Sequence, residues 1–468
     1  MTHQIHRLIN CCVFITVFLN GSAFGQVSQP DKALSSNQGI NKNTTTAFPD
    51  TRQRVKDNAA ADRVNQNHGK ILRANAEECG FDASALQKVV PTLQGFVDRG
   101  KIPGAAVAVV RGNKLLMLDT VGYRNIAEEQ PMRADTIFRI YSMTKPITSV
   151  AAMMLVEQGK LGLDDPVAKY IPAFAKAKVF AGMQGKKILT QPLARPISIR
   201  DLLRHTAGLT YGYFGESKVD LLYRDANVLS DDDTAAELSA KVAAIPLMFQ
   251  PGTEFQSSVS VDVLGRVIEI VTGMGLDKYF QDMIFAPLGM VDTGFFVPNK
   301  SISRFSTNYE VDENDQLSVF DSPKTSRFNA KPRMLSGGGG LVSTIMDYVR
   351  FAQMLRNGGV YNGKRILTTE SVQEMTRNQL PPNAIPISAA NNKMPGMAFG
   401  LGVSVDVGRK KMGRVSLRGE YGWDGMASTS FWSSPETNMT VVLLTQLYPY
   451  SPQLEMAVRP LVYQAVKD

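Results

Sequence analysis

Two residues three positions apart, Ser142 and Lys145, are of types that together can do nucleophilic chemistry. A serine hydroxyl is a poor nucleophile until a base takes its proton, and a lysine amine held partly out of water can be that base. The apolar run 147–155 follows, and residues three apart in a helix lie on one face, which brings the amine to the hydroxyl. Pro146 favours a helix that begins near Ser142, because proline is tolerated in a first turn. The hydroxyl would then lie at the positive end of a helix, which suits an oxyanion.

The histidine content argues against two other kinds of hydrolytic site. The sequence has four histidines, of which His3 and His6 fall in an N-terminal leader and His68 in a polar segment. A zinc site built from histidine and cysteine is therefore not expected. His205 has no G-x-S-x-G motif to accompany it, which argues against a Ser-His-Asp triad. We expect a reaction without metal or cofactor, in which Lys145 is the base.

The first 25 residues have the pattern of a secretory signal peptide. Arg7 precedes the apolar run 8–19, and small residues precede Gln26. The apolar run is too short to span a bilayer, so we expect a secreted or periplasmic protein with no membrane span. Residues 26–77 are rich in polar residues and predict a disordered tether, and residues 78–468 predict the folded domain.

The composition is that of a globular protein with an apolar core. Residues of apolar type make up 44% of the chain, and the formal net charge is +8. The lysines and arginines are scattered, so nucleic acid is not an expected partner. The oligomeric state is left open by the sequence.

The order of the predicted elements indicates an α+β fold, an α/β sandwich. An antiparallel sheet is expected from both ends of the chain, with a helical region inserted over about residues 166–330 and the two terminal helices on one sheet face. The periodicities that carry this prediction are helices over 85–97, 142–158, 262–271, 347–357 and 452–466, a hairpin of strands 104–110 and 114–121, and strands 427–432 and 440–444.

Five stretches form a set that is specific when taken jointly: Tyr141 to Pro146, Leu202 to Leu209, Pro251 to Gly265, Pro287 to Met290 and Ser336 to Leu341. Together they resemble the serine β-lactamase and penicillin-binding-protein superfamily, closest to the class C β-lactamase-like family VIII carboxylesterases. The likeness extends from about residue 78 to the C-terminus. It implies a β-lactamase/transpeptidase-like fold, in which helices flank an antiparallel sheet.

The resemblance implies a covalent acyl-enzyme route. Ser142 would attack a carbonyl carbon, with Lys145 in the proton relay, and the N–H groups of Ser142 and Met426 would hold the oxyanion. The stretch Trp423 to Gly425 resembles the Trp-Gly-Gly of esterase-type members. In β-lactamases a lysine at this place helps to bind the carboxylate of the drug, so the tryptophan favours an uncharged ester.

The sequence departs from the family pattern at the second motif. Class C enzymes and family VIII esterases place a tyrosine beside the nucleophile, and the alignment from Pro251 puts Ser257 there. We favour the interpretation that Ser257 is a substitute proton relay. Alternatively, Tyr211 or Tyr213 fills the gap from a neighbouring loop, or the protein is a weak or inactive relative.

We therefore expect a secreted serine hydrolase that cleaves small carboxylic esters through an acyl-serine intermediate, with a small-molecule ester or amide as its partner. A β-lactamase or a D-Ala-D-Ala carboxypeptidase is the alternative within the enzymes. A catalytically weak or inactive binding module on the same fold is the alternative outside them.

Overall fold

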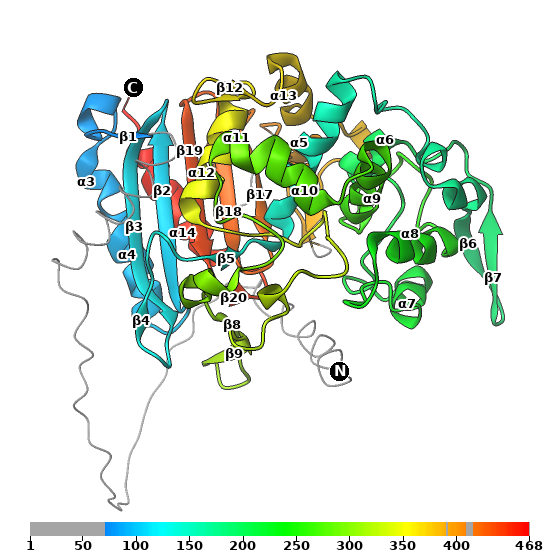
Figure 1. Cartoon of the computed structure of the whole chain (residues 1–468), viewed down its shortest axis with the longest axis horizontal. Coiled ribbons are helices and arrows are strands. Elements are labelled where there is room, and N and C mark those ends of the chain that lie inside the picture. Colours follow the sequence, from blue (N-terminus) through cyan, green and yellow to red (C-terminus); the bar gives the residue numbers. More distant parts are fainter. Residues whose placement is uncertain (1–70, 390–391, 409–414, 468) are drawn as a thin grey trace, which may run out of the picture. The chain divides into compact units, whose positions relative to one another are not determined.

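A nine-stranded, mostly antiparallel sheet is the framework of the protein (Figure 1). The computed structural model describes residues 71–389, 392–408 and 415–467, so the predicted signal peptide and most of the predicted tether lie outside the described residues. The strands are ordered β1 (Leu72–Arg73), β3 (Lys114–Asn125), β2 (Gly104–Arg111), β19 (Met439–Thr445), β18 (Thr429–Ser434), β17 (Tyr421–Gly425), β16 (Ser404–Asp406) and β15 (Met397–Phe399), with β4 (Gln130–Pro131) paired to β3.

The two ends of the chain meet at the centre of this sheet. Strand β2 pairs with β3 as the predicted hairpin, in which Arg111 faces Lys114, and on its other edge β2 pairs with β19. Every residue of β19 and all of β2 except Arg111 are buried. Both strands are continuous apolar or small-residue runs rather than alternating ones, because helices cover both faces of the sheet.

The terminal helices cover one face, as the sequence predicts. Helices α4 (Val89–Asp98) and α14 (Gln453–Gln464) pack on each other and on the sheet, in a core that includes Leu93, Trp432 and Val458. The single predicted helix over 85–97 is two helices. The first, α3 (Ala83–Leu86), begins where the Asp82 carboxylate accepts hydrogen bonds from the first free N–H groups.

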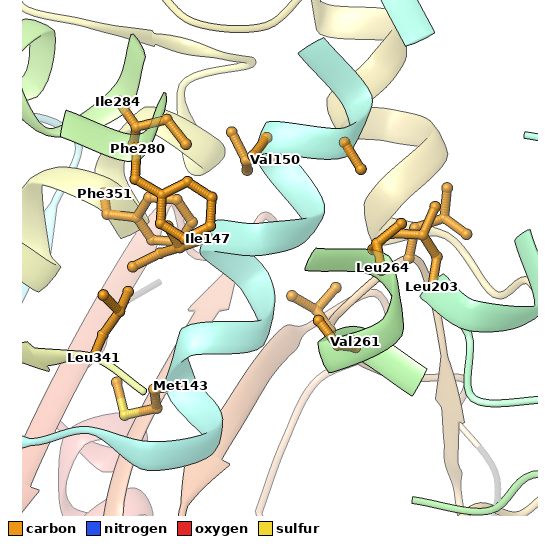
Figure 2. Packing of buried hydrophobic residues seen from close by; sticks show 14 of the residues in the cluster. Met143, Ile147, Val150, Leu203, Val261, Leu264, Phe280, Ile284, Leu341 and Phe351 are labelled. Atoms are coloured by element: carbon orange, nitrogen blue, oxygen red, sulfur yellow. The ribbon is translucent and has the colours of Figure 1, made fainter. Parts of the chain in front are cut away.

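The other face is covered by α5 (Thr144–Glu157) and α12 (Ile345–Arg356). Twelve of the fourteen residues of α5 are buried, so this helix is enclosed on all sides. Figure 2 shows how it is held: Phe280, Ile284, Leu341 and Phe351 lie on one side, and Leu203, Val261 and Leu264 lie on the other. A helix packed in this way gives its first turn a fixed position.

All described strands of the main sheet lie either before residue 132 or after residue 396, so the insertion is longer than the predicted 166–330. It holds helices and also small β elements, which the prediction of a helical region did not include. Besides α5 and α12, its α-helices are α6 (Ile199–Leu203), α7 (Lys218–Asp225), α8 (Ala235–Ala244), α9 (Ser260–Thr272), α10 (Leu276–Phe280), α11 (Ala286–Leu288) and α13 (Thr369–Thr376). The small strands are β5 (Phe138–Arg139), β6 (Val179–Gln184), β7 (Lys187–Gln191), β8 (Asn308–Val311), β9 (Leu317–Asp321), β10 (Val342–Ser343), β11 (Val360–Tyr361), β12 (Lys364–Arg365), β13 (Ser388–Ala389) and β14 (Asn392–Lys393), and β20 (Leu447–Tyr448) joins β8.

The folded unit begins earlier than the predicted boundary at residue 78. Ile71 is 2% exposed, and β1 runs parallel to β3 with Leu72 opposite Lys114. Residues 71–74 therefore belong to the sheet framework rather than to a tether. Across the described ranges, no helix combines the length and the apolar character needed to cross a bilayer.

Candidate active site

Ser142 lies in a short 3₁₀ turn, η3 (Tyr141–Met143), between β5 and α5. The sequence places the start of the helix near Ser142, and α5 begins two residues later, at Thr144. Tyr141 has a left-handed backbone with φ of 40°, which is uncommon for a residue with a side chain. Such a conformation persists only where the surrounding structure holds it. It fixes the backbone direction at Ser142, the next residue in the turn. Ser142 is partly exposed, whereas Lys145 is fully buried.

The Lys145 amine forms hydrogen bonds both with Ser142 and with the buried backbone of the glycine turn 337–340. Its Nζ donates to Ser142 Oγ at 2.8 Å and to the carbonyl oxygen of Gly338 at 2.7 Å. Burial lowers the pKa of Lys145 from 10.5 to about 8, and the negative charge of Asp262 counteracts part of that effect. Near pH 8 a large fraction of the amine is therefore neutral, and its lone pair is available to take the proton of the Ser142 hydroxyl.

Asp262 is a buried carboxylate that the sequence did not single out as a site residue. Its Oδ1 accepts hydrogen bonds from Ser336 Oγ at 2.5 Å and from the N–H of Gly338 at 3.0 Å. Burial raises the pKa of Asp262, and these donors together with Lys145 oppose that rise. Gly338 thus touches both charged groups, through its N–H to Asp262 and through its carbonyl to Lys145. An acidic residue in the mostly apolar stretch 259–264 was the only sequence signal for this partner.

Three of the four glycines 337–340, namely Gly337, Gly338 and Gly340, are required by this close packing. A Cβ on Gly338 would lie 2.4 Å from Asp262 Oδ2, and one on Gly337 would lie 2.7 Å from the carbonyl oxygen of Val261. Neither position has room for a side chain. This agrees with the interpretation of the run as a tight turn where backbone meets backbone, and it gives the turn a function as the support of the Lys145 amine.

The end of β17 passes directly beside the nucleophile turn. A Cβ on Gly425 would lie 2.3 Å from the carbonyl oxygen of Ile140, so this position also demands glycine. Met426 follows in the turn to β18, which the Ser428 N–H closes by donating to Gly425 at 2.9 Å. Two residues before the turn, Trp423 packs edge-on against Phe399, with ring centroids 4.9 Å apart. The backbone at Gly425 and Met426 is therefore placed next to Ser142.

Tyr211 lies beside the Lys145 amine. Lys145 Nζ is 5.5 Å from the centroid of the Tyr211 ring, over its face, and Tyr213 stacks on Tyr211 at 6.3 Å with an interplanar angle of 4°. Burial raises the pKa of Tyr211 well above its usual value, and the negative charge of Asp262 adds to the rise. Tyr211 is thus a neutral phenol near the amine. Phe214 completes the aromatic group by edge contacts to both tyrosines.

Ser257 and His205 have different surroundings. Ser257 is partly exposed, and in the described part of the chain no hydrogen-bond partner is found for its hydroxyl. His205 is fully buried and its Nδ1 lies 3.3 Å from Ser258 Oγ. Burial lowers the pKa of His205 well below 6.5, so this histidine is neutral and held by packing. The structure thus brings Ser142, Lys145, Tyr211 and the Gly425 turn together, and the role of Ser257 stays a prediction.

Comparison with known proteins identifies the class to which this fold and site belong. The profile of the Beta-lactamase family matches residues 89–461, and the chain belongs to that family. The fold is accordingly that of the serine β-lactamases and penicillin-binding proteins, and relatives in the superfamily include esterases.

The chain is similar to two curated relatives and to one solved structure. Protein Rv1367c of Mycobacterium tuberculosis is 35% identical over 365 residues, covering 76% of this chain and 89% of that protein. Lovastatin esterase of Penicillium rubens is 30% identical over 343 residues, covering 71% of this chain and 84% of the esterase. The structure of EstCE1, a hydrolase with promiscuous acyltransferase activity, matches with a TM-score of 0.68 at 27% identity, covering 81% of this chain and 99% of EstCE1.

Within the described ranges, no group of three or more histidine, cysteine, aspartate or glutamate side chains is arranged to hold a metal ion. The ionisable groups gathered at Ser142 are those already described: the Lys145 amine, the Asp262 carboxylate and the Tyr211 phenol.

The pH dependence of hydrolysis tests the coupling between Lys145 and Asp262. Because the neutral amine is the reactive form, kcat/KM is expected to rise with pH through a midpoint near 8, the value to which burial lowers the pKa of Lys145. Asp262→Asn removes the negative charge that favours the protonated amine, so its midpoint should fall below that of the wild type.

Asp220→Asn is the matched control, since Asp220 is a buried carboxylate that accepts from Thr210 and Ser217 rather than from the site. Its profile should keep the wild-type midpoint. A profile with the same midpoint in all three proteins would contradict the coupling.

Proposed function

We propose that this chain is a secreted serine hydrolase that cleaves small, uncharged carboxylic esters through an acyl-serine intermediate. The observation that carries the proposal is the 2.8 Å contact between Ser142 Oγ and an amine whose pKa burial lowers to about 8. The pattern of the first 25 residues supports export.

The reaction follows from the positions of these groups. Neutral Lys145 takes the proton from Ser142 as Oγ attacks the ester carbonyl carbon, and the carbonyl oxygen becomes an oxyanion. The N–H groups of Ser142 and Met426 stabilise that oxyanion; one such donor typically contributes roughly 10²–10³ in kcat. The proton then passes to the departing alkoxide, which leaves as an alcohol. Water attacks the acyl-serine by the reverse proton path and releases the acid.

The surroundings of Ser142 favour an uncharged substrate. The ring of Tyr211 faces the Lys145 amine, and Tyr213 and Phe214 pack against that ring. Trp423 stands at the position where the resembling β-lactamases carry a lysine for the carboxylate of the drug. The name of lovastatin esterase describes an ester substrate for that relative, and EstCE1 is described as a hydrolase with acyltransferase activity. Both descriptions are compatible with an acyl-serine that either water or an alcohol can attack.

A non-catalytic binding module is the less favoured alternative. A fully buried lysine whose pKa is lowered from 10.5 to about 8 destabilises the folded protein at neutral pH. A binding module gains nothing from this, whereas a hydrolase needs a neutral amine at the nucleophile.

Substitution of the two central residues tests the proposal directly. Ser142→Ala should lower hydrolysis of p-nitrophenyl acetate and butyrate by at least about 10³-fold, since it removes the nucleophile. Lys145→Arg should also be inactive, because a guanidinium keeps its proton at any working pH although the positive charge is retained.

A fluorophosphonate probe with mass spectrometry locates the reactive serine in the same samples. Labelling is expected on Ser142 of the wild type. Equal ester hydrolysis by the wild type and Ser142→Ala would reject the nucleophile assignment. Nitrocefin turnover exceeding ester turnover would favour the β-lactamase alternative instead.

The identity of the second proton-relay group calls for a separate comparison. We propose Ser257 for this role, because Lys145 faces the ring of Tyr211 rather than its hydroxyl and because no hydrogen-bond partner is found for the Ser257 hydroxyl in the described part of the chain. Ser257→Ala should then lower kcat by about tenfold or more, as expected when a general acid or base is removed.

Tyr211→Phe is the matched control, because it keeps the aromatic ring beside Lys145 and removes only the hydroxyl. Its kcat should stay within about threefold of the wild-type value, since the phenol has no part in the proposed relay. A larger loss in Tyr211→Phe than in Ser257→Ala would assign the relay to Tyr211.

A further inference from the structure

The hairpin of β6 and β7, with the residues that lead into it, differs in charge and exposure from the rest of the inserted region. We define the basic hairpin as residues 176–191. It contains four lysines, Lys176, Lys178, Lys186 and Lys187, and no acidic residue. All four lysines are exposed, and none has an ion-pair partner in the described ranges. The segment thus presents four uncompensated positive charges.

The same hairpin also exposes apolar side chains near its tip. Met183 is 41% exposed and Leu189 is 36% exposed. Met183 pairs across the strands with Ile188, whereas Leu189 pairs with Gly182, so the apolar side chains lie on both faces of the ribbon. Lys186 and Lys187 follow directly at the turn. The tip of the hairpin thus combines exposed apolar side chains with lysines, a combination found in segments that lie at a membrane interface.

The hairpin is attached only at its base and stands away from the catalytic residues. The Phe180 N–H donates to Leu247 at 2.9 Å, and the Leu247 N–H donates to Lys178 at 2.8 Å. Beyond Phe180, residues 181–187 are exposed with the exception of the half-buried Gly182. Figure 1 shows β6 and β7 projecting at the outer edge of the inserted region, beyond α8 and far from the first turn of α5. The hairpin therefore takes no part in the proposed hydrolysis.

We propose that the basic hairpin docks the protein on a membrane surface of anionic lipids. Lysine ammonium groups on a flexible stem reach the phosphates of the headgroups, while Met183 and Leu189 enter the boundary between headgroups and acyl chains. Each basic residue near an anionic surface typically strengthens binding about fivefold. The apolar side chains distinguish this surface from a site for a soluble polyanion, which would be bound by charge alone. Docking at the hairpin would hold the enzyme at a lipid surface and leave Ser142 free.

Vesicle sedimentation of the full chain tests this proposal independently of its catalytic activity. The wild type should partition more strongly onto vesicles of phosphatidylglycerol and phosphatidylcholine than onto phosphatidylcholine alone, and the difference should shrink at high salt. Lys186→Glu with Lys187→Glu should weaken the partition onto anionic vesicles by about twentyfold or more. The control is Lys88→Glu with Lys364→Glu, which makes the same change of charge at two exposed lysines elsewhere and should keep most of the binding.

A second pair of variants separates membrane docking from simple charge attraction. Met183→Ser with Leu189→Ser keeps all four lysines and should weaken the partition several-fold, since it removes the apolar insertion. Circular dichroism and thermal melting verify that each variant is folded. The proposal is overturned if the hairpin and control charge variants lose binding equally. It is also overturned if the serine variant binds as the wild type does and soluble polyphosphate displaces the protein, which would identify a polyanion site.

Discussion

The structure depends on the placement of one amine, that of Lys145, in the interior of the protein. The shift of its pKa from 10.5 to about 8 corresponds to roughly 3 kcal/mol of preference for the neutral form. This preference destabilises the folded protein, because the lysine of the unfolded chain is charged where the buried amine resists the charge. The destabilisation is present in full below pH 8. It disappears as the pH rises toward the pKa of an ordinary lysine, above which the lysine of the unfolded chain is neutral as well. The contacts to Ser142, Gly338 and Asp262 determine how far the pKa falls, and so they set the pH range in which the base is available.

The rest of the fold serves to hold these contacts. Helix α5 is enclosed by apolar side chains on both sides, as Figure 2 shows, so the single turn between Ser142 and Lys145 has little freedom to move. Strand β17 and the glycine turn 337–340 approach the same place from two other directions, and glycine is required at each point of closest contact. A hydroxyl and an amine at the start of α5, a carboxylate of α9 and the glycine turn 337–340 thus meet, from three separate segments, where an ester carbonyl would be attacked. Because these groups are positioned before any substrate arrives, little reorganisation is needed during the reaction.

The sequence predicted the parts of this arrangement that have a local signal. Ser142 and Lys145 are separated by one helical turn, and the β2–β3 hairpin and helices α5, α9, α12 and α14 follow apolar periodicities. Asp262 was not recognised, because its partners Ser336 and Gly338 lie more than 70 residues away and only the fold brings them together. The strands β1, β6 and β7 were missed, since short, largely exposed strands have no apolar alternation to detect. The contact of Lys145 with the ring of Tyr211 is likewise a tertiary effect.

The protonation state of Lys145 is the quantity that tests this account most directly. In protein labelled with ¹³C at lysine Cε, NMR titration resolves the Lys145 signal, which is assigned by its absence in Lys145→Arg. The account predicts that this signal titrates near pH 8, well below the ordinary value of 10.5 for a lysine side chain. A Lys145 signal that titrates at that ordinary value would show that the amine is charged at neutral pH, and it would contradict a lysine base at Ser142.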